Sequence, residues 1–212
     1  MNLGVSAMNA MDIITKLKDH KPTILGQENY KEFSVLIPLL EVNGETHILF
    51  EVRSSKLRSQ PGDICFPGGK IDRNDVDEKD CAIRETTEEL GIARSSILQV
   101  TPLDYLVSFG SIIYTFVGKI SNDEKMNINK DEVEEVFTVP LSYLMNTKPE
   151  KYRVDFEVKP ESDFPYELIQ GGKDYDWRPR KLDEYFYFYE DRVIWGLTAK
   201  ILTNFLSLIH TK

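Results

Sequence analysis

Cysteine, histidine and positive charge are all scarce in this chain of 212 residues. Its two cysteines, Cys65 and Cys81, are too few for a disulfide framework and form no C-x-x-C knuckle. The three histidines do not cluster in the sequence, so neither a zinc site nor cysteine-based catalysis is expected. With 26 Lys and Arg against 35 Asp and Glu, the formal charge is −9. This balance argues against general binding to nucleic acid or to anionic membranes.

A long uninterrupted apolar run is also missing. The longest apolar stretch, residues 193–209, is broken by Lys200 and Asn204, which predicts a buried amphipathic helix rather than a membrane span. The first eleven residues hold no Lys or Arg, so a secretory signal is not expected. The final three residues are not a peroxisomal address. We therefore expect a soluble, cytoplasmic protein.

No internal repeat and no Gly/Ser-rich or Pro-rich linker divides the chain, so we expect one domain over residues 1–212, with residues 1–30 as an N-terminal helical extension. Helices are predicted over residues 12–18, 77–90, a short stretch opened by Pro140, and the C-terminal run. Strands are predicted over residues 33–42, 46–52, 63–66, 98–107, 112–120, 133–139 and 184–189. Residues 121–131 are expected to be a polar loop and residues 146–183 to be irregular. This order favours an α/β class, either α+β or a layered α/β/α sandwich with a mixed sheet.

The informative stretch is an acidic helix that follows a glycine turn. On a helix, Glu85 and Glu89 share one face with Glu88 beside them, and their like charges repel. A hard divalent cation, Mg²⁺ or Mn²⁺, would neutralise them, and Arg84 could hold one of them by a bidentate pair. The alternative is an ordinary solvated helix face. The turn Pro67-Gly68-Gly69 favours the metal site, because it lets a peptide carbonyl approach whatever the helix binds.

These residues resemble the signature box of the Nudix hydrolases. The matching positions are Gly69, Arg84-Glu85, Glu88-Glu89, Gly91 and Ile92. The usual box also has a glutamate eight residues before the arginine, where this chain has Val76. The distance from Gly69 to Arg84 is one residue longer than usual.

The longer spacing is similar to that of the coenzyme A diphosphatase subfamily, and an upstream signature agrees. Its matching positions are Arg53-Ser54, Arg58, Gly62 and Phe66-Pro67-Gly68-Gly69. A run over residues 194–199 is similar to the subfamily's C-terminal helix, whereas residues 49–52 fit its usual Leu-Leu-Thr only loosely. The resemblance covers residues 33–202, which we take as the core.

The resemblance implies a Nudix-type α/β/α sandwich with a mixed central sheet. It further implies Mg²⁺- or Mn²⁺-dependent hydrolysis of the diphosphate in coenzyme A or its thioesters. The products would be 4′-phosphopantetheine, or its acyl form, and adenosine 3′,5′-bisphosphate. Glu85 and Glu89 would be metal ligands, with Glu88 as a third ligand or an orienting neighbour. The carbonyl of Gly69 would complete the coordination, and Arg84 would pair with a helix glutamate.

Substrate contacts and the general base are less constrained. Residues 51–73 hold five basic against three acidic side chains, so we expect Arg53, Arg58 and Lys70 to contact substrate phosphates, although they could be ordinary surface residues. The candidate bases follow in a downstream segment and are Glu132, Glu134 and Glu135, which could equally be a polar loop entering a strand. The aromatic residues within 146–183 could shape a pocket or pack a core.

Two rival functions stay open at this stage. One is a Nudix enzyme of other specificity, acting on nucleoside triphosphates, ADP-ribose or dinucleotide polyphosphates. The other is a catalytically silent domain that binds a nucleotide as a sensor, an option that Val76 leaves open. The expected partner in each case is a small nucleotide, with no nucleic acid and no membrane, and homodimer formation is left open.

Overall fold

A computed structural model describes residues 9–121 and 125–210, and it divides the chain into two compact units after Tyr30. The first unit contains the helix α1 (Ala10–Leu17), which begins two residues earlier than the sequence predicts. Asn9 caps this helix by accepting a hydrogen bond from the backbone N–H of Asp12, whose side chain accepts one from Asn9 in return.

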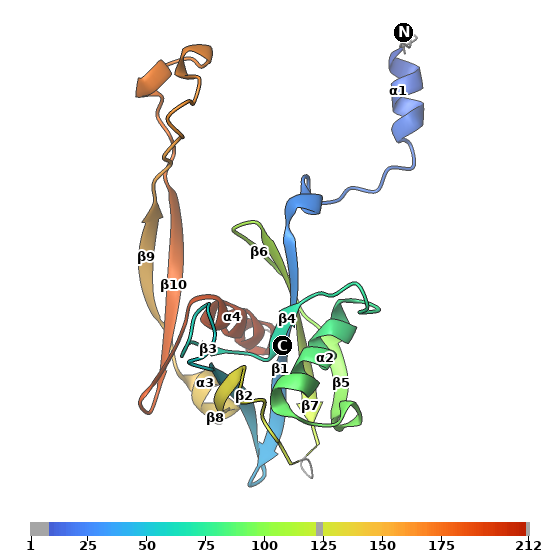
Figure 1. The fold of residues 1–212 in the computed structure, drawn as a ribbon, viewed down its shortest axis with the longest axis vertical. Coiled ribbons are helices and arrows are strands. Elements are labelled where there is room, and N and C mark those ends of the chain that lie inside the picture. The colour runs from blue at the N-terminus through green and yellow to red at the C-terminus, as the bar shows by residue number, and fades with distance from the viewer. Residues whose placement is uncertain (1–8, 122–124, 211–212) are drawn as a thin grey trace. The chain divides into compact units, whose positions relative to one another are not determined.

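The second unit is built on a mixed eight-stranded sheet (Figure 1). Its strands are β1 (Lys31–Val42), β2 (Glu45–Arg53), β3 (Ile64–Cys65), β4 (Gly68–Lys70), β5 (Ile97–Pro102), β6 (Leu106–Ser108), β7 (Ser111–Ile120) and β8 (Val133–Pro140). The main order is β3-β2-β1-β7-β5, with β4 paired to β1, β6 to β7 and β8 to β2. Only the β1–β7 pairing is parallel among the described strands, and it makes the sheet mixed, as predicted.

The turn between β1 and β2 is the two-residue hairpin that the sequence predicts. Asn43 and Gly44 both have left-handed backbone angles, with φ of 52° and 83°. These angles match a type I′ turn, whose twist suits the strands that it joins. The turn fixes the register, with Val42 opposite Glu45.

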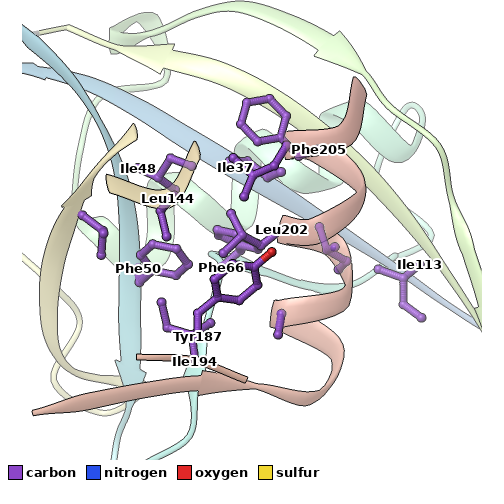
Figure 2. Packing of buried hydrophobic residues seen from close by; sticks show 14 residues of the cluster. Ile37, Ile48, Phe50, Phe66, Ile113, Leu144, Tyr187, Ile194, Leu202 and Phe205 are labelled. Carbon is purple, nitrogen blue, oxygen red and sulfur yellow. The ribbon is translucent and has the colours of Figure 1, made fainter. Parts of the chain in front are cut away.

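Helices cover both faces of the sheet, which confirms the α/β/α sandwich. Alternate residues of one strand point to opposite faces. Leu36 and Leu49 therefore pack with Leu90 of α2 (Glu78–Leu90). Their neighbours in sequence pack with Leu202 and Phe205 of α4 (Gly196–His210) on the other face, together with a residue of the short helix α3 (Leu141–Asn146). Figure 2 shows this second cluster, in which Ile37, Ile48, Phe50 and Leu144 lie beside α4.

The region predicted to be irregular contains a strand, so that prediction was wrong in part. Here β9 (Glu150–Phe156) pairs with β10 (Arg180–Tyr189), and β11 (Arg192–Trp195) completes a three-stranded antiparallel sheet. Most of β9 is exposed and polar, so it lacks the alternation that marks a half-buried strand. The strand predicted over residues 184–189 begins earlier, and it is followed by β11 rather than directly by the last helix.

Two further boundaries differ from the prediction. The strand predicted over residues 98–107 is broken into β5 and β6, which both pair with β7. Pro140 is the residue before α3 rather than its first residue. Part of the loop predicted over residues 121–131 lies outside the described residues. Among the residues that are described, no helix combines the length and hydropathy needed to cross a membrane.

Candidate active site

Gly68 and Gly69, predicted as a turn, lie in strand β4 beside the acidic helix. Strand β4 pairs with β1 so closely that a Cβ on Gly68 would lie 2.3 Å from the carbonyl oxygen of Ser34. A Cβ on Gly69 would lie 2.3 Å from the carboxylate of Glu85. Gly68 therefore requires glycine, because a Cβ there would overlap backbone, whereas a Cβ on Gly69 would displace the Glu85 carboxylate. The turn predicted over Pro67-Gly68-Gly69 was thus wrong in part, because Gly68 and Gly69 belong to β4; the strand places Gly69 against the face of α2 that carries Glu85.

Both ends of α2 are fixed. At its start, the Asp77 side chain accepts the backbone N–H of Asp80 at 2.7 Å. At its end, Gly91 has a φ of 62°, and a Cβ there would overlap the carbonyl of Asn127. The segment after this contact runs along the end of the helix, where the N–H of Asn129 donates to the carbonyl of Glu89 at 2.9 Å.

The three helix glutamates differ in burial and therefore in electrostatics. Glu89 is buried, and one of its carboxylate oxygens accepts the N–H of Gly68 at 2.8 Å. Burial raises the pKa of Glu89 to about 8, with further contributions from the charges of Glu85 and Glu132. Burial also raises the pKa of Glu85, against the opposing effect of Arg84. Glu88 is the most exposed of the three.

Arg84 holds this face of the helix in place. It contacts Glu85 at 2.9 Å and Glu88 at 3.3 Å, in keeping with the predicted pairing to a helix glutamate. Its strongest partner is Asp75, which it binds by two hydrogen bonds of 2.7 and 2.9 Å. The Asp75 side chain is 2% exposed, and Arg84 holds its pKa well below the usual range.

Asp75 was not predicted from the sequence, because the glutamate of the usual box aligns with the next residue, Val76. Val76 stands where the usual glutamate is expected, and it is exposed. The loop before α2 turns so that Asp75 reaches Arg84 instead. The longer spacing between Gly69 and Arg84 was the available signal, since one additional residue shifts the register of any partner in that loop.

The Arg-Ser pair of the upstream signature ties two loops together. Ser54 is fully buried; its N–H donates to the carbonyl of Glu132 at 2.8 Å and its hydroxyl to the carbonyl of Lys130 at 3.2 Å. The backbone of Arg53 pairs with that of Asp63, and its guanidinium donates to the carbonyl of Ser59. Its Nε is buried with no hydrogen-bond partner among the described residues.

A further acidic side chain lies inside the sheet at this place. Glu51 on β2 is 1% exposed, and its Oε1 has no hydrogen-bond partner in the described structure. Burial, followed by the charge of Glu89, raises the pKa of Glu51 well above its usual range. Cys65 lies opposite Glu51 across the β2–β3 pair. Burial and the two carboxylates raise the pKa of its thiol to about 12, which agrees with the expectation of an unreactive cysteine.

The three predicted candidates for the general base are placed differently. Glu132 lies beside the site, since its charge acts on Glu85 and Glu89. Glu134 is exposed at the start of β8. Glu135 pairs in register with Val52, on the face opposite to Glu51, and its carboxylate binds Arg192 at 2.7 Å. The structure therefore does not bring Glu135 to the helix glutamates.

The residues predicted to contact phosphates are placed differently. Lys70 lines a pocket of about 250 Å³ together with Arg84, Glu85 and two polar residues of the loop before α2. Arg58 is exposed in the loop that follows β2. Of the aromatic residues within 146–183, Phe164 and Trp177 contact each other in the segment between β9 and β10.

The donor atoms suit a hard divalent cation. The Glu85 carboxylate lies against Gly69, a Glu89 carboxylate oxygen accepts the N–H of Gly68, and the charge of Glu89 acts on the buried Glu51; none of the three is a histidine or a reactive thiolate. An unpaired, fully buried carboxylate oxygen is the kind of atom that a cation would satisfy. In the part of the chain that the structure describes, no three acidic, Cys or His side chains converge on one point.

Comparison with known proteins places the chain in a family. A model of the NUDIX domain matches residues 31–160. The peroxisomal coenzyme A diphosphatase of Mus musculus is 36% identical in an alignment that covers 68% of this chain and 56% of the relative's length. The mitochondrial coenzyme A diphosphatase of Homo sapiens is 36% identical over 83% of this chain and 68% of its own length. A MutT/nudix family protein from Enterococcus faecalis shares the fold, with a TM-score of 0.51, 15% identity, and coverage of 96% of this chain and 70% of its own. The chain therefore belongs to the Nudix family.

Proposed function

We propose that this protein hydrolyses the diphosphate of coenzyme A or its thioesters, with a divalent metal ion as cofactor. The products would be 4′-phosphopantetheine, or its acyl form, and adenosine 3′,5′-bisphosphate. The observation that carries this proposal is the packing of Gly69 against Glu85, which joins the coenzyme A-type signature loop to the acidic face of α2. Two relatives named coenzyme A diphosphatases support the choice of substrate.

The metal would be held by Glu85 and Glu89, with the carbonyl of Gly69 completing the coordination and Glu88 beside them. When bound, Mg²⁺ or Mn²⁺ would withdraw charge from the diphosphate and make a water molecule more acidic. Arg84 positions Glu85 and Glu88 through its ion pairs and is itself held by Asp75. The chain would thus supply carboxylates for the metal ion on which this phosphoryl transfer depends.

Glu132 is our candidate for the base that takes the proton of the attacking water. Its backbone is fixed by Ser54, and its charge already acts on the helix glutamates. Glu134 follows two residues later and is the second candidate. Arg53, Arg58 and Lys70 would bind substrate phosphates and offset the charge of an acidic protein.

Product analysis by chromatography tests this function. The protein with Mg²⁺ or Mn²⁺ would be offered coenzyme A, ADP-ribose and a nucleoside triphosphate in parallel, beside Glu85→Gln. We expect adenosine 3′,5′-bisphosphate from coenzyme A alone, and none from the variant. Turnover of only the other substrates would keep the metal site and discard the coenzyme A assignment. Binding without any turnover would favour a nucleotide sensor.

Other features remain proposals of the same kind. We treat residues 1–212 as one Nudix domain with an extension over residues 1–30, and Mg²⁺ and Mn²⁺ as the candidate metals. Location in the cytoplasm stays a prediction, since the two relatives bear peroxisomal and mitochondrial names. Homodimer formation is likewise open.

A further inference from the structure

Strand β2 holds two buried polar atoms of opposite character that have no hydrogen-bond partner among the described residues. One is Oε1 of Glu51 and the other is Nε of Arg53. Residues two apart on a strand point to the same face, and Leu49, two residues before Glu51, packs in the cluster beneath α2. Both side chains therefore face the helix that carries Glu85 and Glu89.

The surroundings of Glu51 make its ionised form costly. The charges of Glu89 and Glu132 act on it unfavourably, and the opposing charge is that of Arg53. Its neighbour across the β2–β8 pair, Val136, packs in the apolar cluster beneath α2. A carboxylate buried among carboxylates and apolar groups is costly unless a cation satisfies it. An apolar side chain would fill the same place without that cost.

Arg53, two residues after Glu51, has the complementary feature, a buried hydrogen-bond donor without an acceptor. Its terminal nitrogen donates to the carbonyl of Ser59, whereas Nε stays unpaired and does not bond to Glu51. Each side chain thus has one buried atom without a hydrogen-bond partner: a carboxylate oxygen of Glu51 and Nε of Arg53. A divalent cation that carries a diphosphate supplies a partner to both atoms at once.

We propose that Glu51 is a further ligand of the divalent metal, supplied by the sheet rather than by α2, and that Nε of Arg53 binds the diphosphate that this metal carries. This inference rests on the proposed function for the identity of the site. It goes beyond that function, because Glu51 lies outside the helix box, in the stretch over residues 49–52 where this chain fits the subfamily's Leu-Leu-Thr only loosely. The metal would then join β2 to α2.

Manganese binding to the metal-free protein tests the role of Glu51 directly. Free Mn²⁺ would be followed by electron paramagnetic resonance during titration of the parent chain and of Glu51→Gln, which has the same shape without the charge. We expect about tenfold or greater weakening of Mn²⁺ binding, as loss of one carboxylate ligand implies. Glu89→Gln serves as the positive control, and Glu41→Gln on β1 as the matched strand control. Binding by Glu51→Gln within twofold of the parent would overturn the proposal.

A second variant guards against failure to fold. Circular dichroism would compare the variants with the parent, and Glu51→Asp keeps the charge but withdraws the oxygen by one methylene. We expect Glu51→Asp to weaken Mn²⁺ binding as well, because a ligand must reach its metal. Parent-like affinity in a folded Glu51→Asp together with Glu51→Gln would show that Glu51 is structural.

The Arg53 part of the proposal has its own test. Arg53→Lys keeps the charge and removes Nε. Calorimetry with inorganic pyrophosphate and Mn²⁺ is expected to show about tenfold weaker pyrophosphate binding, with Mn²⁺ affinity alone unchanged. Unchanged pyrophosphate binding would refute this part.

Neither test depends on turnover of coenzyme A. If coenzyme A is not hydrolysed but Glu51→Gln weakens Mn²⁺ binding, the proposed function fails and this inference stands. If coenzyme A is hydrolysed and Glu51→Gln binds Mn²⁺ as the parent does, the reverse is true.

Discussion

The same strands form both faces of the central sheet, but the two faces bury side chains of different character. The face under α4 is apolar throughout its buried cluster, with Phe50 and Leu202 fully buried. The face under α2 interrupts its apolar cluster with charged groups, of which Glu51 and Glu89 are buried. Successive residues of β2 thus point alternately to the apolar cluster beneath α4 and to the charged groups beneath α2. The apolar packing on the α4 face stabilises the fold. This stabilisation offsets the cost of burying carboxylates on the α2 face, where their like charges repel.

The largest expected effect is on stability, from the α4 face. Phe50→Ala removes a fully buried ring that stacks on Phe66 and Phe137. We expect the free energy of unfolding to fall by about 3–5 kcal/mol. Urea titration would measure it, while Mn²⁺ affinity of the folded fraction should stay unchanged. Equal losses of stability and metal affinity would mean that the two faces are not separable.

The next largest effect is on catalysis, from the α2 face. Glu89→Gln removes a charge but keeps the shape, so we expect about a hundredfold or greater loss of kcat/KM through weaker metal binding. Stability without metal should not fall, because the buried carboxylate is already disfavoured in the folded state. Thermal melting in a chelator would check this, and a markedly lower Tm than the parent's would contradict the comparison.

A smaller effect is expected at Asp75, which holds Arg84 beside the helix glutamates. Asp75→Asn leaves Arg84 without its bidentate partner, and we expect about a tenfold loss of kcat. Unfolding free energy should fall by about 1–3 kcal/mol, because the partner guanidinium is left partly buried. Steady-state kinetics and urea titration measure the two. Full activity in Asp75→Asn would show that Arg84 keeps its position through the helix glutamates alone.

The smallest effect is the pH dependence of the fall in unfolding free energy that Asp75→Asn causes. Arg84 lowers the pKa of Asp75 in the folded chain, so ionised Asp75 stabilises the fold above its unfolded pKa of about 3.9. The stability difference between parent and Asp75→Asn should be full above about pH 5 and shrink as the pH falls below about 4. Urea titrations at a series of pH values would show this, with the exposed Asp163→Asn as control. A difference that grows toward low pH would have the wrong sign.

Local signals predicted much of the fold. Asn43-Gly44 specified its hairpin, and Gly91 specified the end of α2, because few residues accept their backbone angles. Strand β9 escaped prediction because its residues are stabilised by pairing with β10 rather than by a buried face. Such pairing leaves no periodic pattern in the sequence.

The site was predicted where its residues follow each other on one helix, and missed where they meet through space. Glu85 and Glu89 are one turn apart, so their shared face follows from helical geometry. Asp75 reaches Arg84 through the path of a loop, which spacing alone does not give. Glu51 is a carboxylate in a strand that is buried on both faces, where a polar residue ordinarily indicates the solvent side.

The contacts that hold Glu132 in place are made by main-chain atoms. The N–H of Asn129 meets the carbonyl of Glu89, and the N–H of Ser54 meets the carbonyl of Glu132. These main-chain contacts do not depend on residue type, but two side-chain contacts do: Oδ1 of Asn129 accepts the N–H of Asp131, and the Ser54 hydroxyl binds the carbonyl of Lys130. A single insertion or deletion between Asn129 and Glu132 would shift the Glu132 carboxylate relative to Glu85 and Glu89.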